Sequence, residues 1–177
     1  MHHPAGFTLV ETLATLAIVA VLLAVGLPNF GDVLARHQVR SAMHLISTDL
    51  AMARNSAIMR RSPVVACPRT ETLRCRSDAD WSHGWIVFAD PDGNRKPDVD
   101  SDLLRIAGPP SGAGRSLRLG ATRTFVRYQR DGRSAGTNLT VRVCSRGDLG
   151  GSVVVNNLGR VRSARPVGPT PCPIQQS

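Results

Sequence analysis

The stretch that decides the fold is Gly6-Phe7-Thr8-Leu9-Val10-Glu11-Thr12-Leu13, which leads into a long apolar segment near the N-terminus. Residues 12–31 carry no formal charge, and residues 13–27 are nearly all Leu, Ala, Val and Ile. About 20 apolar residues are what an α-helix needs to cross a bilayer. We therefore expect one transmembrane helix, with the carboxylate of Glu11 at the edge of the hydrocarbon.

Glu11 is expected to meet a cation, because an ionised carboxylate at that depth is costly unless it is paired. Its own segment offers none, so an intermolecular partner explains it best, since opposite charges in a low dielectric offset much of each other's desolvation cost. The alternative is an interfacial carboxylate that simply reaches water. Residues 1–6 contain no Lys or Arg, which fits an ordinary cleaved secretory signal poorly.

An amphipathic helix is predicted beyond Pro28, reaching about Arg61. Apolar residues recur there mostly three or four positions apart, with charged residues between them. This apolar stripe comprises Val33, Leu34, Val39, Ala42, Met43, Ile46, Leu50, Ala53, Ala57 and Ile58. We expect the stripe to cover a sheet.

Short β-like runs separated by Gly, Pro and Asp follow Pro63. Seven candidate strands are residues 64–67, 85–89, 103–107, 117–119, 122–129, 139–144 and 152–156. Short, evenly spaced runs of this kind favour antiparallel sheets. The predicted class is therefore α+β, with a long N-terminal helix packed on antiparallel sheets.

The net charge lies entirely in the C-terminal part of the chain. The 177 residues include 22 basic and 13 acidic ones, a formal +9. Residues 105–177 hold 12 Arg against Asp131 and Asp148, whereas the rest is nearly neutral. Such asymmetry indicates a polyanionic partner, either nucleic acid or an anionic surface. An Arg-rich proteome is the alternative cause of the arginine excess.

Four cysteines, at positions 67, 75, 144 and 172, predict two disulfides in a domain outside the cytoplasm. Of the three possible pairings, Cys67 with Cys75 and Cys144 with Cys172 are preferred, the second tethering a proline-rich tail. A zinc site is the rival, but no two cysteines stand two to four residues apart, as zinc ligands usually do.

Between Asp90 and Asp102, five aspartates and Asn94 gather in a segment that offers enough oxygen ligands for calcium. The glycine and the final Glu that an EF-hand loop requires are missing from their positions. A polar turn with Asx-type hydrogen bonds is the preferred interpretation, and calcium binding stays open.

No catalytic motif is apparent. His37, His44 and His83 fit no metal-binding spacing, no G-x-S-x-G is present, and the cysteines are expected to be oxidised. The chain is therefore predicted not to be an enzyme and to need no cofactor or metal.

The C-terminal segment Gly159-Arg160-Val161-Arg162-Ser163-Ala164-Arg165 is the candidate binding element. In an extended chain, residues two apart project to the same side, so Arg160 and Arg162 would form a fork about 7 Å wide. Each guanidinium can grip a phosphate through two hydrogen bonds. Gly159 would allow a sharp turn, and Arg165 would extend the row. The alternative is a solvated basic strand with no ligand.

The stretch from Gly6 to Leu13 resembles the signal of type IV pilins and type II secretion pseudopilins. That resemblance implies that a prepilin peptidase cuts after Gly6 and methylates Phe7. It also implies that Glu11 meets the freed amine of a neighbouring subunit in a filament.

Two further elements extend the resemblance over most of the chain. Gly84-Trp85-Ile86-Val87-Phe88-Ala89-Asp90 is similar to the signature of the GspH/FimT branch of these proteins, and we expect Trp85 and Phe88 to pack on the helix stripe. The G-R-x-R element looks like the one near the C-terminus of FimT-type minor pilins, which bind DNA during natural transformation. By that resemblance Gly159, Arg160, Arg162 and Arg165 contact DNA. Further arginines that would widen this surface are Arg123, Arg127, Arg130, Arg133, Arg142 and Arg146.

The resulting prediction is a minor type IV pilin that binds double-stranded DNA non-specifically. The alternatives are a minor pseudopilin of a type II secretion system and a minor pilin that only primes assembly. Expected partners are DNA, other pilins, the prepilin peptidase and the inner membrane, followed by a place in a cell-surface pilus. The expected segments are a leader (1–6), a transmembrane half-helix (7–28), an amphipathic half-helix (29–62), a β-rich body (63–165) and a tail (166–177).

Overall fold

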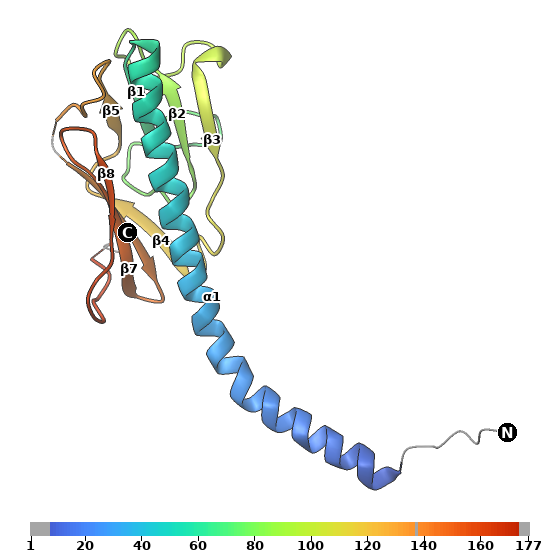
Figure 1. The fold of residues 1–177 in the computed structure, drawn as a ribbon. Helices are drawn as coiled ribbons and strands as arrows, with labels where there is room; N and C mark the ends of the chain where they lie inside the picture. Colours follow the sequence, from blue (N-terminus) through green and yellow to red (C-terminus); the bar gives the residue numbers. More distant parts are fainter. Residues whose placement is uncertain (1–7, 137, 174–177) are drawn as a thin grey trace. The chain divides into compact units, whose positions relative to one another are not determined.

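A computed structural model describes residues 8–136 and 138–173, without the side chains of residues 25–29. The chain divides into two compact units, Met1–Ala35 and Arg36–Ser177. Among the described residues, one α-helix, α1 (Leu9–Arg60), is followed by antiparallel strands (Figure 1). The α+β class predicted from the sequence is confirmed.

In the first unit, α1 begins with a polar cap and then presents apolar side chains. The hydroxyl of Thr8 accepts a hydrogen bond from the main-chain N–H of Glu11 at 3.3 Å, which satisfies one of the free donors at the helix start. Large apolar side chains are exposed along the unit, among them Leu9, Leu16, Leu22 and Phe30. The sequence predicts a membrane span here; within the described residues, no helix combines the length and the apolar character that crossing a membrane requires.

The second unit contains two four-stranded antiparallel sheets. The first has the order β3-β2-β1-β5, formed by β1 (Val64–Pro68), β2 (Trp85–Ala89), β3 (Leu103–Ala107) and β5 (Val126–Tyr128). The second has the order β4-β6-β7-β8, formed by β4 (Leu117–Ala121), β6 (Leu139–Ser145), β7 (Asp148–Val155) and β8 (Val161–Ala164). A 3₁₀ turn, η1 (Asp100–Asp102), precedes β3.

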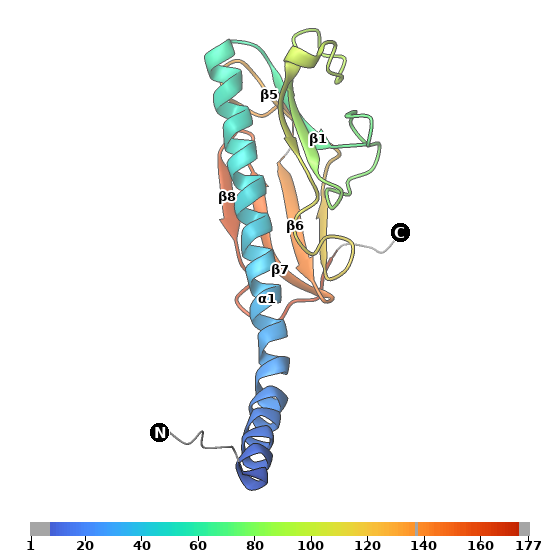
Figure 2. The same cartoon turned by 90° about the vertical axis from the view of Figure 1, so that its right-hand side faces the viewer.

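The part of α1 within this unit lies along both sheets and supplies one wall of the main core (Figure 2). Its buried stripe includes Ala42, Ile46, Leu50 and Ala53, four of the positions that the periodicity predicts. Small residues on the stripe let the helix approach the strands closely. We call the face of the second sheet that meets α1 its inner face, and the opposite one its outer face.

Three sequence expectations need correction. The seven candidate strands do not include residues 161–164, yet these residues form β8 at the edge of the second sheet. The strand expected over residues 122–129 is shorter, because only Val126–Tyr128 pairs with β1. Phe88 does not pack on the helix. Side chains alternate along β2, so Trp85 joins the main core while Phe88 lies in a second cluster with Val65 and Ile86.

Two disulfides brace this unit. Cys67 is bonded to Cys75, which closes a short loop after β1, and Cys144 is bonded to Cys172, which holds the C-terminal segment against β6. These are the pairings that the sequence analysis preferred. The second bond keeps residues up to Pro173 beside the second sheet, where Pro171 bridges to Asp148.

Candidate nucleic-acid interface

A hairpin between β7 and β8 carries the predicted binding element. Val155 pairs with Val161 and Val154 with Arg162 in the antiparallel register. The hairpin closes through Asn156, whose main-chain N–H donates to the carbonyl of Arg160 at 3.1 Å and whose side-chain oxygen accepts the N–H of Arg160 at 2.9 Å. Arg160 therefore continues the ladder of β8 by one position.

Gly159 is required at the turn of this hairpin. Its φ is +77°, in the region that side chains disfavour, and a Cβ there would come within 1.9 Å of the carbonyl oxygen of Gly132. That carbonyl also accepts a hydrogen bond from Nε of Arg54 at 3.0 Å. The glycine thus lets the hairpin pack onto a neighbouring loop, which positions the first arginine of the fork.

Alternation about Val161 places Arg160 and Arg162 on one side of the sheet. Val161 between them packs against the main core from the inner face, and alternation directs its two neighbours to the outer face. Both arginines are exposed, and neither side chain forms an ion pair with any residue in the described ranges. Arg165 follows the end of β8 and is also exposed. By alternation the two exposed guanidinium groups would therefore stand side by side, which remains a prediction for Arg160 because it precedes the first residue of β8.

A pocket at the edge of β8 brings a third arginine close to this pair. It is lined by Arg54 and its helix neighbours Ala51 and Asn55, together with residues 159–162. The sequence places Arg54 only on the polar side of the helix, and nothing in its spacing relates it to the C-terminal element. Packing of α1 beside β8 creates that proximity.

Of the other arginines proposed to widen the surface, Arg123, Arg127 and Arg133 have partners among the described residues. Arg127 on β5 donates to the carbonyl of Asp90 at 3.0 Å and faces the buried carboxylate of that residue at 3.5 Å. Arg123 donates to the carbonyl of Ala135, and Arg133 pairs with Asp131. Arg127 lies on the first sheet and is held by Asp90, so it does not widen the basic surface around Arg160 and Arg162.

The acidic loop between Asp90 and Asp102 binds its own main chain. Asp90 accepts the N–H of Arg95 at 3.1 Å, Asp92 accepts that of Asn94, and Asp102 accepts that of Asp98. The bond between Asn94 and Asp92, two residues apart, is of the Asx type expected of a polar turn, and the other two bonds span four and five residues. Among the described residues, no cluster of His, Cys, Asp or Glu has a geometry suited to a metal ion.

Of the predicted assembly residues, Glu11 is the one that the structure describes. Its side chain is exposed and forms no ion pair with a residue in the described part of the chain. Gly6 and Phe7, the predicted cleavage and methylation positions, lie outside the described residues.

Two family models match the chain. One, described as "Type II transport protein GspH", matches residues 42–159, and the other, described as "Prokaryotic N-terminal methylation motif", matches residues 1–27. No curated protein matches significantly.

The fold is similar to that of the type IV minor pilin FimU of Pseudomonas aeruginosa, known from two crystal forms. One superposes with a TM-score of 0.58 and 17% identity, covering 74% of this chain and 90% of that one. The other gives 0.55 and 16%, covering 73% and 95%. At such identity the likeness concerns the fold alone.

Proposed function

Since the chain belongs to the GspH family of type IV pilin-like proteins, we propose that it is a minor type IV pilin whose β8 arginines hold double-stranded DNA. The observation that carries the proposal is the fork itself. Arg160 and Arg162 stand exposed on one face without an acidic partner among the described residues, on a strand fixed by the core.

Physical chemistry favours a phosphate backbone as the ligand of this fork. A guanidinium is always charged and matches two oxygens of a phosphate in a planar geometry. Contacts of this kind position a protein on DNA without distinguishing bases. Binding is therefore expected to be independent of sequence and to weaken as salt rises, because bound phosphates release counterions. Such contacts suit DNA uptake in natural transformation.

The N-terminal segment would serve insertion and assembly. The matched methylation motif supports cleavage after Gly6 and methylation of Phe7 by a prepilin peptidase. The exposed apolar side chains of the first unit suit either lipid or neighbouring pilin helices. Glu11 would then pair with the free amine of an adjacent subunit. In this account the protein resides first in the inner membrane and then in a surface pilus, and its role is structural rather than enzymatic.

The test compares the full-length protein with Arg160→Gln/Arg162→Gln in detergent, using a fluorescent random-sequence duplex and anisotropy at two salt concentrations. We expect wild type to bind and the double variant to lose at least about tenfold in affinity, because two phosphate contacts are removed. Arg36→Gln/Arg40→Gln is the matched control, since it removes the same charge from exposed positions of α1.

Failure of the wild type to bind at low salt would contradict the proposal. A role as a minor pseudopilin in type II secretion would then stand first, which the description of the matching family favours.

A further inference from the structure

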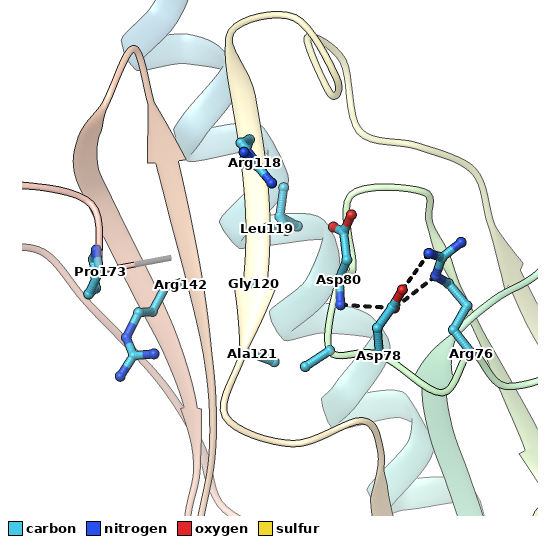
Figure 3. Close-up of a pocket in the computed structure, with 10 residues that line it drawn as sticks. Arg76, Asp78, Asp80, Arg118, Leu119, Gly120, Ala121, Arg142 and Pro173 are labelled. Carbon is cyan, nitrogen blue, oxygen red and sulfur yellow. Dashed lines mark hydrogen bonds and ion pairs between the residues drawn. The ribbon is translucent and has the colours of Figure 1, made fainter. Parts of the chain in front are cut away.

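A second basic site lies on the outer face of the second sheet, away from the β8 fork. It is a hollow of about 540 Å³ that β4 and β6 share with the segment preceding β2 and with the C-terminal tail. Figure 3 shows Arg118 on β4 and Arg142 on β6, with Pro173 of the tail beside Arg142. Neither guanidinium makes a hydrogen bond or ion pair with a described residue.

The two acidic residues of the hollow are already engaged. Asp78 receives hydrogen bonds from Arg76, one of them from Nε at 2.9 Å, and this contact holds the pKa of Asp78 below its usual value of 3.8 although burial opposes the shift. Asp80 accepts the main-chain N–H of Ser82 at 2.9 Å. Asp78 and Asp80 thus have partners of their own, while Arg118 and Arg142 retain their full capacity to donate.

Register places the two arginines next to each other on one face. Arg118 is paired with Cys144 across β4 and β6, and Arg142 precedes Cys144 by two residues. Directly opposite residues share a face, as do residues two apart in a strand. Arg118 and Arg142 are therefore diagonal neighbours, about 7–8 Å apart at their Cα atoms.

The same register connects this pair to the β8 fork. Thr140 precedes Arg142 by two residues and is opposite Val154 on β7, which is in turn opposite Arg162 on β8. All of these side chains consequently project from the outer face. Arg142 and Arg162 are two strands apart and offset by two residues along the strands. Their Cα atoms are therefore about 12 Å apart.

Four arginines thus follow a diagonal line across the outer face, in the order Arg118, Arg142, Arg162 and Arg160. Successive arginines are about 7 to 12 Å apart at their Cα atoms. The inner face of the sheet beneath them is part of the apolar core. No carboxylate of the described residues pairs with any of the four. A linear polyanion can contact such a line at several points, whereas an isolated ion would use one.

We propose that Arg118 and Arg142 form a second phosphate-binding site, occupied by the backbone of the duplex that the β8 fork holds. This inference rests on the proposed function and extends it, because it gives the DNA a direction across the second sheet. The proposed ligand is a phosphodiester of a polymer, which contacts the fork and the second site at the same time. A free phosphate ion would instead bind the second site whether or not the fork is intact.

The experiment measures duplex affinity of the full-length protein over a series of salt concentrations. For Arg118→Gln/Arg142→Gln we expect the slope of log affinity against log salt to fall by about 2, with affinity reduced roughly 10- to 30-fold at 0.15 M salt. Arg118→Lys/Arg142→Lys should keep most of the slope, since charge is retained. Arg36→Gln/Arg40→Gln again controls for net charge.

The outcomes separate the two proposals. One outcome is that wild type binds DNA and the fork variant binds more weakly, while Arg118→Gln/Arg142→Gln has the same affinity and salt slope as the control Arg36→Gln/Arg40→Gln. That outcome refutes the second site and leaves the proposed function standing. If wild type does not bind, both fail. A further measurement adds millimolar inorganic phosphate to the duplex at low salt. We expect it to displace little duplex, and to the same extent from wild type and from the residual binding of the fork variant. Strong displacement from the fork variant, which retains only the second site, would refute a polymer ligand.

Discussion

Gly159 lies where a side chain would collide with the main chain of a neighbouring loop. The change Gly159→Ala is expected to cost about 1–2 kcal/mol for the left-handed backbone and about 1–3 kcal/mol more for the clash with the Gly132 carbonyl. Urea denaturation followed by tryptophan fluorescence measures the loss. DNA affinity should also fall, because the turn that presents Arg160 is displaced.

Gly147 offers a matched control for that prediction. Its φ is +93°, but a Cβ at this position would meet nothing within 4 Å. Gly147→Ala should therefore show the backbone cost alone and leave DNA affinity unchanged. Equal destabilisation by the two changes would show that the close approach of Gly132 does not matter.

Asp49 links the helix to the first sheet. Its buried carboxylate accepts the indole N–H of Trp85 at 2.9 Å and faces the guanidinium of Arg105 at 3.3 Å. Asp49→Ala should lower the free energy of unfolding by about 2–3 kcal/mol, since the Trp85 donor would be buried without a partner. Thermal unfolding followed by circular dichroism measures the change.

Arg105 provides the comparison for Asp49. Because its side chain is 45% exposed, Arg105→Gln should cost less than about 1 kcal/mol, as exposed ion pairs usually do. A larger loss for Arg105→Gln than for Asp49→Ala would contradict the assignment of the indole contact as the important one.

At the scale of elements, the two disulfides should differ in their contribution. They close loops with sequence separations of 8 and 28 residues. In the chain-entropy account, losing Cys67–Cys75 costs about 2.5 kcal/mol and losing Cys144–Cys172 about 3.5 kcal/mol. Denaturation of the two double Cys→Ser variants checks this order; a reversed order would mean that native contacts, and not loop length, dominate.

The helix and most strands could be predicted because their patterns are local. The apolar stripe with Ile46 and Leu50 follows the helical period, and the buried strands are bounded by turn residues. The strand β8 could not be found this way. Its outer-face residues, Arg162 and Ala164, are exposed and only Val161 packs on the core, so little alternation of apolar and polar residues marks it.

The candidate site was predictable only in part, for the same reason. Arg160 and Arg162 are two apart in sequence, so their shared face follows from alternation alone. Arg118 and Arg142 come together through the register of β4 with β6, which depends on long-range pairing. The proximity of Arg54 to the turn depends on how α1 packs. Neither relation leaves a signal in the spacing of the residues.

At the scale of the whole molecule, the basic surface of the second sheet and the exposed apolar surface of the N-terminal unit belong to different parts of the chain. Arg118, Arg142 and Arg162 project from the outer face of the second sheet, with Arg160 beside them, while its inner face and α1 form the core. Most of the large apolar side chains that are exposed in the described residues, among them Leu9, Leu16 and Leu22, belong to the N-terminal unit. DNA contacts and assembly contacts can therefore be altered separately, so the arginine variants should still enter filaments.

The most direct measurement is an NMR titration of the arginine side-chain Nε–H groups of the full-length protein in detergent with a short random duplex. The account predicts saturable shifts for Arg160 and Arg162 that disappear at high salt, with no shifts for Arg36 and Arg40. Saturable shifts confined to other arginines, or no shifts at low salt, would contradict the claim that the β8 fork holds the phosphate backbone.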